Sequence, residues 1–345
     1  MAKAVTLSDI GERLEISTVT VSKALSGQKG VSEELRKKII GLADEMGYTK
    51  AVKNNKERNS YTIGAIVAER YLQENQSFYW KLYQEINQNA IASNSFTMLE
   101  VISYAVEKNC ELPKTVIEDK IDALIVIGAF KLEYMNMLNE KIMVPRLNLD
   151  ATSVGNNCDF VVSNNLMGGY LMTNHLFELG HRKIGFVGTR LATTSIDDRY
   201  FGYLKSLMEH GIPWRENWIV DDRDREYGKV DYDNKFRLPL ADMPSAFFCN
   251  CDLSASLLIR KLGEAGYSVP DDISVVGFDN YIIDQFGSAG ITTYEIDIKE
   301  MAGKAVHMIL NKLTKSNYTA GMFVMHGKFI ERGSAKQVGL AVPFV

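Results

Sequence analysis

The chain has 345 residues, of which 46% are hydrophobic and 24% charged, and its formal net charge is −4 at pH 7. This composition excludes a disordered or fibrous chain, and the length allows two or three globular domains. No apolar run approaches the roughly 20 residues that cross a bilayer, and the N-terminus MAKAVTLSDIG carries charges where a signal peptide needs its apolar region. The sequence therefore predicts a cytoplasmic protein with no membrane partner.

Three short helices are predicted at the N-terminus. Apolar residues recur at helical spacing in TLSDIGERLEI, and in STVTVSKALSG Ser17 is a preferred N-cap and Gly27 a common stop. The alternating Thr and Val residues of the second segment would also suit a strand, but its neighbours favour a helix. A third helix is expected between Ser32 and Gly47. Two helices joined by a tight turn, followed by a third, predict a helix-turn-helix unit that can enter the major groove.

The charge of this region is compatible with nucleic acid but does not require it. Residues 1–60 hold 11 Lys and Arg against 8 Asp and Glu. An excess of this size is by itself more often a solvated surface than a DNA-binding one. The motifs therefore carry the functional argument.

The N-terminal motifs resemble the headpiece of the LacI/GalR family of transcriptional repressors. Family headpieces begin with a T-L-x-D-(I/V)-A-like helix and continue with V-S-x-x-T-V-S-(R/K)-x-L, and this chain has TLSDIG at 6–11 and ISTVTVSKAL at 16–25. The resemblance implies that operator DNA is the partner of residues 1–48. It places Thr18, Val19 and Lys23 on base-reading positions. It places Ser17, Thr20 and Ser22 on phosphate-contacting positions, and Leu7, Ser8 and Ser32 complete the expected headpiece contacts.

The chemistry of these residue types agrees with such roles. Lysine can donate to guanine acceptors, valine can pack on a thymine methyl group, and hydroxyl groups suit phosphate oxygens. The alternative for each residue is an exposed polar position on an ordinary small helical bundle.

Residues 49–61 form a polar linker rich in Lys and Asn. In the resembled family this segment carries a hinge helix of the type P-N-x-x-A-R-x-L, whose leucine wedges into the minor groove. This chain has no Pro after Tyr48 and no leucine before Ile63. We expect Lys53, Lys56 and Arg58 to contact phosphates instead.

From Tyr61 onward, strands are predicted to alternate with helices. The runs YTIGAIVA, DALIVIGAF, RKIGFVG, PSAFFCN and DISVVGFD are short and almost continuously apolar, as in strands buried on both faces of a parallel sheet. The segments NNLMGGYLMTNHLFELGH and CDLSASLLIRKLGEAGY have helical spacing. This alternation predicts doubly wound α/β lobes that bind ligands beyond the carboxyl ends of their strands.

The resemblance to the family extends over this core. The segments HLFELGHRKIGFVG, VPDDISVVGFDN, ITTYEID and IERGSA look like landmarks of its effector-binding core. The fold class implied is a small all-α headpiece followed by two doubly wound parallel-sheet lobes around a ligand cleft, of periplasmic-binding-protein-like type I. The core is expected over 62–345. Its first lobe is expected over about 62–162 and 292–320, and its second over 163–291 and 321–338.

A small-molecule effector, with a carbohydrate as the favoured class, is expected between the lobes. Asp279 at the end of VVGFDN and Arg199 at the start of RYFGYLKSL correspond to family ligand contacts, and together they suit the paired hydroxyl groups of a sugar. Their alternatives are a helix cap for Asp279 and a surface ion pair for Arg199. The full expected set is Phe78, Tyr79, Asp150, Arg199, Asn250, Cys251, Asp252 and Asp279.

Catalysis, metal binding and a bound cofactor are not predicted. The sequence lacks a G-x-S-x-G elbow, a P-loop and an HExxH motif, and Cys249 and Cys251 have no second ligand pair at zinc spacing. The predicted function is a homodimeric repressor that binds a pseudo-palindromic operator under effector control. The rival functions are a sugar or nucleoside receptor whose N-terminal helices contact protein, and a DNA-binding regulator whose effector is a purine or a partner protein.

Overall fold

The structure is a computed structural model that describes residues 7–25, 31–46, 60–72, 77–153, 158–281 and 290–338. The chain forms two compact units, Met1–Arg58 and Asn59–Val345. In the described ranges, no helix combines the length and the apolar character that spanning a bilayer requires.

The N-terminal unit, called the headpiece, is a three-helix bundle. Its helices are α1 (Leu7–Leu14), α2 (Thr18–Leu25) and α3 (Glu33–Glu45). The buried side chains of its core come from all three helices and are Ile10, Val21, Ala24, Ile39 and Ala43. The segment STVTVSKALSG is thus helical as predicted, because Val21 turns into this core.

The turn between α1 and α2 is held by short-range hydrogen bonds. Glu15 has a φ of +55°, and the Ile16 amide donates to the Gly11 carbonyl at 2.9 Å. Ser17 caps α2, with its Oγ accepting from the Thr20 amide at 3.1 Å. Arg36 of α3 donates to the Ala24 carbonyl at 2.8 Å. This bond supplies a donor to a backbone carbonyl in the last turn of α2, where the helix itself provides none. The two helices of the motif are therefore fixed against the third.

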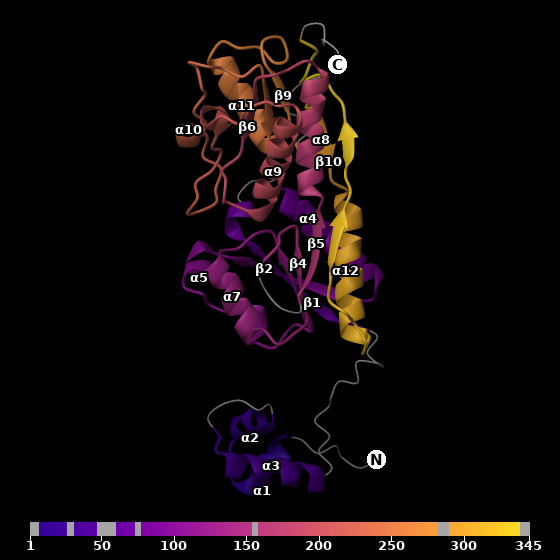
Figure 1. Ribbon diagram of the computed structural model, residues 1–345. Helices are drawn as coiled ribbons and strands as arrows, with labels where there is room; N and C mark the ends of the chain where they lie inside the picture. Colours follow the sequence, from indigo (N-terminus) through magenta and orange to yellow (C-terminus); the bar gives the residue numbers. More distant parts are fainter. Residues whose placement is uncertain are drawn as a thin grey trace. The chain divides into compact units, whose positions relative to one another are not determined.

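Lobe 1 of the core is built on a six-stranded parallel sheet of order β11-β5-β4-β3-β1-β2. The strands are β1 (Thr62–Ala68), β2 (Phe96–Ile102), β3 (Ala123–Ile127), β4 (Arg146–Leu149), β5 (Asp159–Ser163) and β11 (Met322–Met325). Helices α4 (Phe78–Ala92) and α12 (Ile298–Thr314) pack on one face, and α5 (Tyr104–Lys108), α6 (Lys114–Ile117) and α7 (Leu132–Lys141) belong to the other (Figure 1). Burial on both faces explains the nearly continuous apolar runs.

Lobe 2 has a four-stranded parallel sheet of order β7-β6-β8-β9. Its strands are β6 (Ile184–Val187), β7 (Ile219–Val220), β8 (Ala246–Cys249) and β9 (Ser274–Val276). Its helices are α8 (Asn165–Glu178), α9 (Thr194–Glu209), α10 (Tyr232–Lys235) and α11 (Asp252–Glu264), with short 3₁₀ turns at η1 (Glu69–Tyr71) in lobe 1 and η2 (Glu216–Trp218) here.

Two glycines allow α8 and α9 to pack closely. A Cβ atom at Gly169 would overlap the backbone carbonyl of Arg199, and one at Gly202 would overlap that of Leu166. The close approach brings the start of α9 against the start of α8. It thereby fixes the position of Arg199.

Within the described residues the chain crosses between the lobes three times, and two of these crossings differ from the sequence prediction. The first, between β5 and α8, lies near residue 164 as expected. Strand β10 (Thr293–Glu295) pairs with β12 (Lys328–Ile330). Thr292, just before it, bridges Val276, and Glu295 bridges Asp279, so lobe 1 resumes only at α12. Strand β11 pairs with β5, so residues 322–325 belong to lobe 1 and not to lobe 2 as predicted.

The reason for this error is the shortness of the crossing strands. Strands of three or four residues carry no periodicity that a sequence pattern can assign to one sheet.

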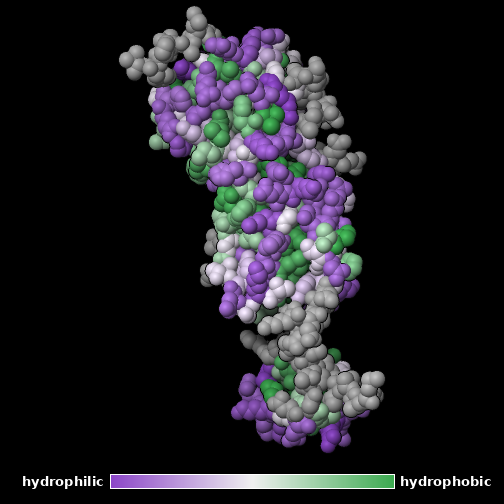
Figure 2. All heavy atoms as spheres, turned by 90° about the vertical axis from the view of Figure 1, so that its right-hand side faces the viewer, coloured by the Kyte–Doolittle hydropathy of each residue, from purple (hydrophilic) through white to green (hydrophobic). Residues whose placement is uncertain are grey.

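Figure 2 turns the side that carries α12 and these strands toward the viewer and shows apolar side chains in separate patches among polar ones.

Candidate functional site

Helix α2 of the headpiece presents a polar face to solvent. Thr18 and Lys23 are exposed, and the Val19 side chain is 60% exposed although it is apolar. Val21 and Ala24 point the other way, into the headpiece core. The residues predicted to read bases thus lie together on the solvent-exposed side of a helix whose other side packs into the headpiece core.

The remaining predicted DNA contacts lie around this helix or outside the described residues. Ser17 and Thr20 share a hydroxyl–hydroxyl bond of 2.9 Å at the start of α2, and Ser32 caps α3 through the Leu35 amide at 3.3 Å. Leu7 and Ser8 belong to α1 and Ser22 to α2, but their side chains are outside the described part, as are Lys53, Lys56 and Arg58 altogether.

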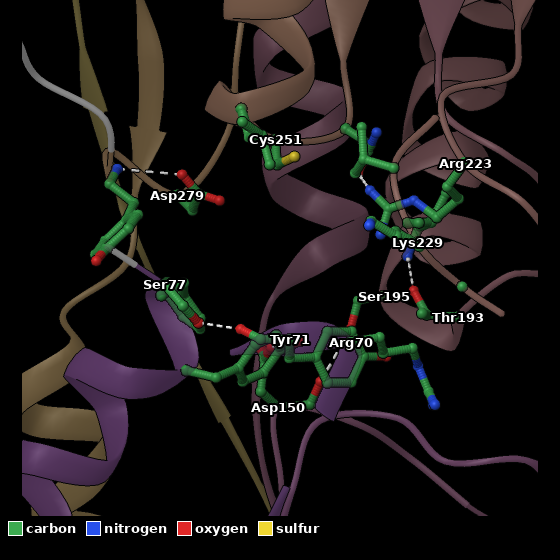
Figure 3. A pocket seen from close by; sticks show the side chains of 18 of the residues that line it. Arg70, Tyr71, Ser77, Asp150, Thr193, Ser195, Arg223, Lys229, Cys251 and Asp279 are labelled. Carbon is green, nitrogen blue, oxygen red and sulfur yellow. Dashed lines mark hydrogen bonds between the residues drawn. The ribbon is translucent and has the colours of Figure 1, made fainter. Parts of the chain in front are cut away.

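The core contains a cavity of about 190 Å³ between the carboxyl ends of the two sheets, here called the inner cavity. Figure 3 shows Arg70, Ser77 and Asp150 of lobe 1 on one side, facing Cys251, Arg223 and Asp279 of lobe 2. The expected effector residues that line it are Phe78, Tyr79, Asp150, Arg199, Asn250, Cys251 and Asp279. Parallel strands end at this edge of each sheet, which is why residues distant in sequence meet here.

Arg199 is the central cation of the inner cavity. Its side chain is buried, its Nε donates to Asn165 Oδ1 at 2.8 Å, and its Nη1 donates to the Asn250 carbonyl at 2.7 Å. The guanidinium lies 3.8 Å from the centre of the Phe278 ring. These contacts hold the group in one orientation, and none of them is a carboxylate. The surface ion pair considered for Arg199 is therefore not what the structure shows.

Asp150 faces Arg199 from lobe 1. Tyr79 donates to Asp150 Oδ2 at 3.0 Å, while Asp150 Oδ1 is buried without a hydrogen-bond partner. Burial raises the pKa of Asp150, and the charge of Arg199 opposes that rise. A buried carboxylate oxygen without a partner is costly, and a ligand hydroxyl group would satisfy it.

Asp279 follows β9 in a strained backbone conformation. Its φ is +94°, and its Oδ1 accepts from the Tyr281 amide at 3.1 Å. Burial raises the pKa of Asp279 to about 7, although Arg199 acts in the opposite direction. Positive φ at a non-glycine residue clusters at functional sites. Here it aims the carboxyl group into the inner cavity.

Asp252 does not line the inner cavity, contrary to the sequence prediction. It is fully buried as the first residue of α11, and its Oδ1 accepts from the Thr293 hydroxyl at 2.8 Å. Burial first, and then repulsion from Asp279, raise its pKa well above the ordinary value. The first turn of α11 points this side chain back toward β10, so it acts behind the cavity wall.

A buried polar network supports the lobe 2 wall. Asp222 accepts two bonds from Arg223 and one each from Asn250 at 2.7 Å and Ser254 at 2.6 Å. Burial alone would raise the pKa of Asp222, but Arg223 and these donors bring it well below its usual value. Because both charged groups are nearly buried, the network fixes Arg223 and Asn250 at the cavity surface.

The segment 222–231, called the cleft hairpin, reaches from lobe 2 to lobe 1. Arg223 and Val230 form an antiparallel bridge at its base. At its tip, Tyr104 of lobe 1 donates to Glu226 Oε1 at 2.8 Å, and the rings of Tyr104 and Tyr227 lie 4.7 Å apart. The hairpin therefore closes one side of the inner cavity.

Several lining residues were missed by sequence reasoning. They are Arg70, Tyr71, Ser77, Thr193, Ser195, Ile196, Arg223, Gly228, Lys229, Val230, Leu253 and Tyr281. Arg223 and Lys229 occur in the charged stretch DDRDREYGK, which is typical of a solvated loop. Ser77 and Leu253 lie directly next to the predicted Phe78 and Asp252, and this adjacency is the signal that could have found them.

The inner cavity can hold a neutral ligand rich in hydroxyl groups. Asp150, Asp279 and Arg199 supply acceptors and donors at its centre, and Phe78, Tyr79 and Tyr281 supply aromatic faces at its edge. Among the described residues, no group of three or more His, Cys, Asp or Glu side chains is arranged to hold a metal ion.

Comparisons with known proteins match both units. Residues 6–50 match the family described as "Bacterial regulatory proteins, lacI family", and residues 173–335 match the "Periplasmic binding protein-like domain". The chain is similar to the HTH-type transcriptional repressor PurR of Photobacterium profundum, with 25% identity over 336 residues, which cover 96% of this chain and 99% of that protein.

Two solved structures share the fold. The transcriptional regulator CelR–cellobiose complex has a TM-score of 0.68 at 19% identity and covers 96% of this chain and 100% of its own. The lac repressor dimer bound to operator and the anti-inducer ONPF has a TM-score of 0.66 at 19% identity and covers 97% of this chain and 100% of its own. The predicted fold class is confirmed. The prediction that the chain is not an enzyme is also confirmed, because the similar proteins are transcriptional regulators.

Proposed function

Since the chain belongs to the LacI family of transcriptional repressors and combines a DNA-binding headpiece with a ligand-binding core, we propose that a sugar in the inner cavity controls its affinity for operator DNA. The observation that carries this proposal is the convergence of Asp150, Arg199 and Asp279 from three separate segments on one buried point. The protein acts where the chromosome lies, so the cytoplasm remains the proposed compartment. A receptor whose N-terminal helices contact protein is not favoured, because the lacI family match covers residues 6–50.

The hydrogen-bonding groups of the inner cavity favour a carbohydrate. Neighbouring hydroxyl groups of a sugar can donate to a carboxylate and accept from a guanidinium at the same time. Asp150 Oδ1 lacks a donor, while Arg199 is held in place by Asn165 and Asn250 and needs no rearrangement. The similar structure of CelR holds cellobiose.

A purine base or nucleoside is the second candidate, because curated relatives carry the name PurR. A flat base would be expected to stack between parallel aromatic rings. Phe78 and Tyr281 instead stand edge to face, with ring planes at 83° and centres 6.0 Å apart. The ring pairs among the described lining residues are thus tilted or edge to face and form no parallel slot, which favours the sugar as the effector.

We place the contact between two copies of the chain along the edge of lobe 1. Strand β2 ends the six-stranded sheet, and Phe96, Val101 and Ile117 on or next to it are 63%, 47% and 64% exposed. An uncovered edge strand with exposed apolar groups is a liability that a partner removes. A two-fold homodimer would bind a pseudo-palindromic operator, since one headpiece reads too few bases to be selective.

The experiment that tests the proposal is gel retardation of the gene's own upstream DNA by the full chain. Phosphate contacts predict that affinity falls steeply as salt rises. A panel of mono- and disaccharides, with nucleosides alongside, is then added at constant salt. A change in retardation with a sugar supports the proposal. A response confined to nucleosides would reject the sugar while retaining the regulator, and retardation that is absent at low salt would reject both.

Lys23→Ala is expected to weaken binding to the specific operator by about 1–3 kcal/mol and to relax the preference at one base step, if the lysine reads a guanine edge. Competition between operator variants on the gel measures both effects. Lys38→Ala is the matched control, because Lys38 is an exposed lysine of α3 paired with Glu34. An equal loss on specific and unrelated DNA would make Lys23 a phosphate contact.

Effector affinity is expected to rise about tenfold between pH 6 and pH 8. With a pKa of about 7, Asp279 is mainly protonated at pH 6 and mainly ionised at pH 8, and the ionised carboxylate is the stronger acceptor for sugar hydroxyl groups. Titration calorimetry of the sugar identified on the gel measures this slope. The variant Asp279→Asn should show no slope in this range, and a slope of the same size in that variant would contradict the assignment.

A further inference from the structure

Helix α2 is too short to fix its own end. It has eight residues, and the carbonyl groups of its last four residues find no amide partner within the helix. A helix of about two turns is marginal by itself, so contacts from outside decide how its last turn is held. Lys23, which is predicted to read a base, lies in this last turn. The placement of its side chain therefore depends on what holds the end of α2.

Arg36 of α3 supplies that contact. Its Nη1 donates to the Ala24 carbonyl at 2.8 Å and to the Lys23 carbonyl at 3.4 Å. The guanidinium also brings a positive charge to a helix C-terminus, where the backbone dipoles favour it. One side chain of α3 thus binds the backbone of the residue predicted to read DNA, together with that of its neighbour Ala24 in the headpiece core.

Arg36 is itself fixed at the start of α3. Its amide donates to the Ser32 carbonyl at 2.9 Å, and the Ser32 hydroxyl caps the same helix. Its Nε lies 3.8 Å from Glu33 Oε1, and Ile39 holds α3 in the headpiece core. The end of α2 is therefore tied to a helix whose own position is already determined.

The alternative role for an arginine in this unit is a contact with DNA phosphate. The Arg36 side chain is only 15% exposed, and its Nη1 faces two carbonyl groups of the protein. The neighbouring Lys37 and Lys38 are exposed. A cation that neutralises a phosphate has to be accessible to it, so the geometry favours a role of Arg36 inside the headpiece.

We propose that Arg36 is a positioning residue that sets the base preference read by Lys23, because it fixes the last turn of α2 without touching DNA. The proposal rests on the proposed function, since it assumes that Lys23 reads a base edge. Lysine replaces Arg36 only in part, because an ammonium group is a compact point charge and lacks the planar fork of a guanidinium.

Gel retardation by the full chain tests the proposal with three probes. They are the upstream DNA fragment that the chain retards, the same fragment changed at the base pair that Lys23→Ala identifies, and an unrelated duplex of equal length. Arg36→Met keeps an apolar stem and removes the donors, so the preference between the first two probes should fall at least about fivefold. Binding to the unrelated duplex and its dependence on salt should match those of the control Lys37→Met, which removes the adjacent exposed charge and should keep the preference.

The double variant Lys23→Ala with Arg36→Met separates positioning from general stability. If Arg36 acts through Lys23, adding Arg36→Met to Lys23→Ala should change the base preference by less than about twofold. Thermal melting followed by circular dichroism shows whether each variant folds. Arg36→Lys keeps the charge and one donor, so it should retain part of the preference and still decides the question if Arg36→Met does not fold.

Three results would overturn the positioning role. They are an unchanged base preference in Arg36→Met and Arg36→Lys, a further independent loss of preference in the double variant, and an equal loss on all three probes with a weaker dependence on salt. The last of these would make Arg36 a phosphate contact. If Lys23→Ala leaves the base preference unchanged, the proposed role of Lys23 fails and the role of Arg36 fails with it. A chain that retards no DNA at low salt would overturn the proposed function.

Discussion

Replacing Asp279 with alanine is expected to weaken binding of the sugar effector by roughly 30-fold or more. The ionised carboxylate is aimed into the inner cavity beside Arg199, and removing one partner from a buried charged hydrogen bond costs about 2–5 kcal/mol. Binding of effector-free protein to operator should not change, because Asp279 belongs to the core and the DNA contacts to the headpiece. Calorimetry with the effector and gel retardation without it measure the two quantities.

The fold of the Asp279→Ala variant should be preserved. Burial raises the pKa of Asp279 to about 7, which means that the surroundings disfavour its charge, so removing the carboxylate should not lower stability at neutral pH. The matched control is Asp271→Ala, since Asp271 is a largely exposed carboxylate of lobe 2 paired with Lys336. If Asp279→Ala binds the same sugar with unchanged affinity, the inner cavity is not the effector site.

Replacing Asp222 with alanine is expected to reduce the free energy of unfolding by about 3–5 kcal/mol. The change leaves the buried Arg223 without its carboxylate and removes acceptors from Asn250 and Ser254. Denaturant unfolding followed by circular dichroism measures the loss. The neighbouring Asp221→Ala is the control, because Asp221 is partly exposed and lies 3.9 Å from Arg225, and it should cost less than about 1 kcal/mol.

A double variant separates the loss of the ion pair from the loss of packing. Asp222→Leu with Arg223→Met removes both charges and keeps apolar volume, so it should be less destabilising than Asp222→Ala. A loss below about 1 kcal/mol for Asp222→Ala would mean that the network is not the support of the lobe 2 wall.

The part of the inner cavity that could be predicted from sequence consists of residues at strand ends. Asp150, Asn250 and Asp279 each follow an apolar run, and parallel strands bring such positions to one edge. Arg199 could be placed because it opens a recognisable helix. The headpiece helices could be predicted for a similar reason, since caps and helical spacing are local signals.

The residues that could not be predicted depend on pairing between distant segments. Arg223 lies in a charged stretch, and only the placement of β7 and β8 on either side of β6 brings its partner Asp222 against Asn250. Asp252 is next in sequence to Cys251, yet the start of α11 turns one side chain into the cavity and the other toward Thr293. No spacing rule separates two consecutive residues at a helix start.

The three crossings between the lobes have a consequence for biosynthesis. Helix α12, which is buried against α4 and the lobe 1 sheet, and strand β11 are made long after the other elements of lobe 1. The last segment of lobe 2 is also made late: the Ser334 hydroxyl accepts from the Thr292 amide and donates to the Val275 carbonyl. During synthesis lobe 1 cannot complete its core until residues 298–325 have left the ribosome, and lobe 2 lacks the hydrogen bonds of Ser334 until that residue has followed. Nascent chains should therefore expose apolar sheet faces for almost the whole of translation, and we expect them to depend on chaperones until the C-terminal segment is released.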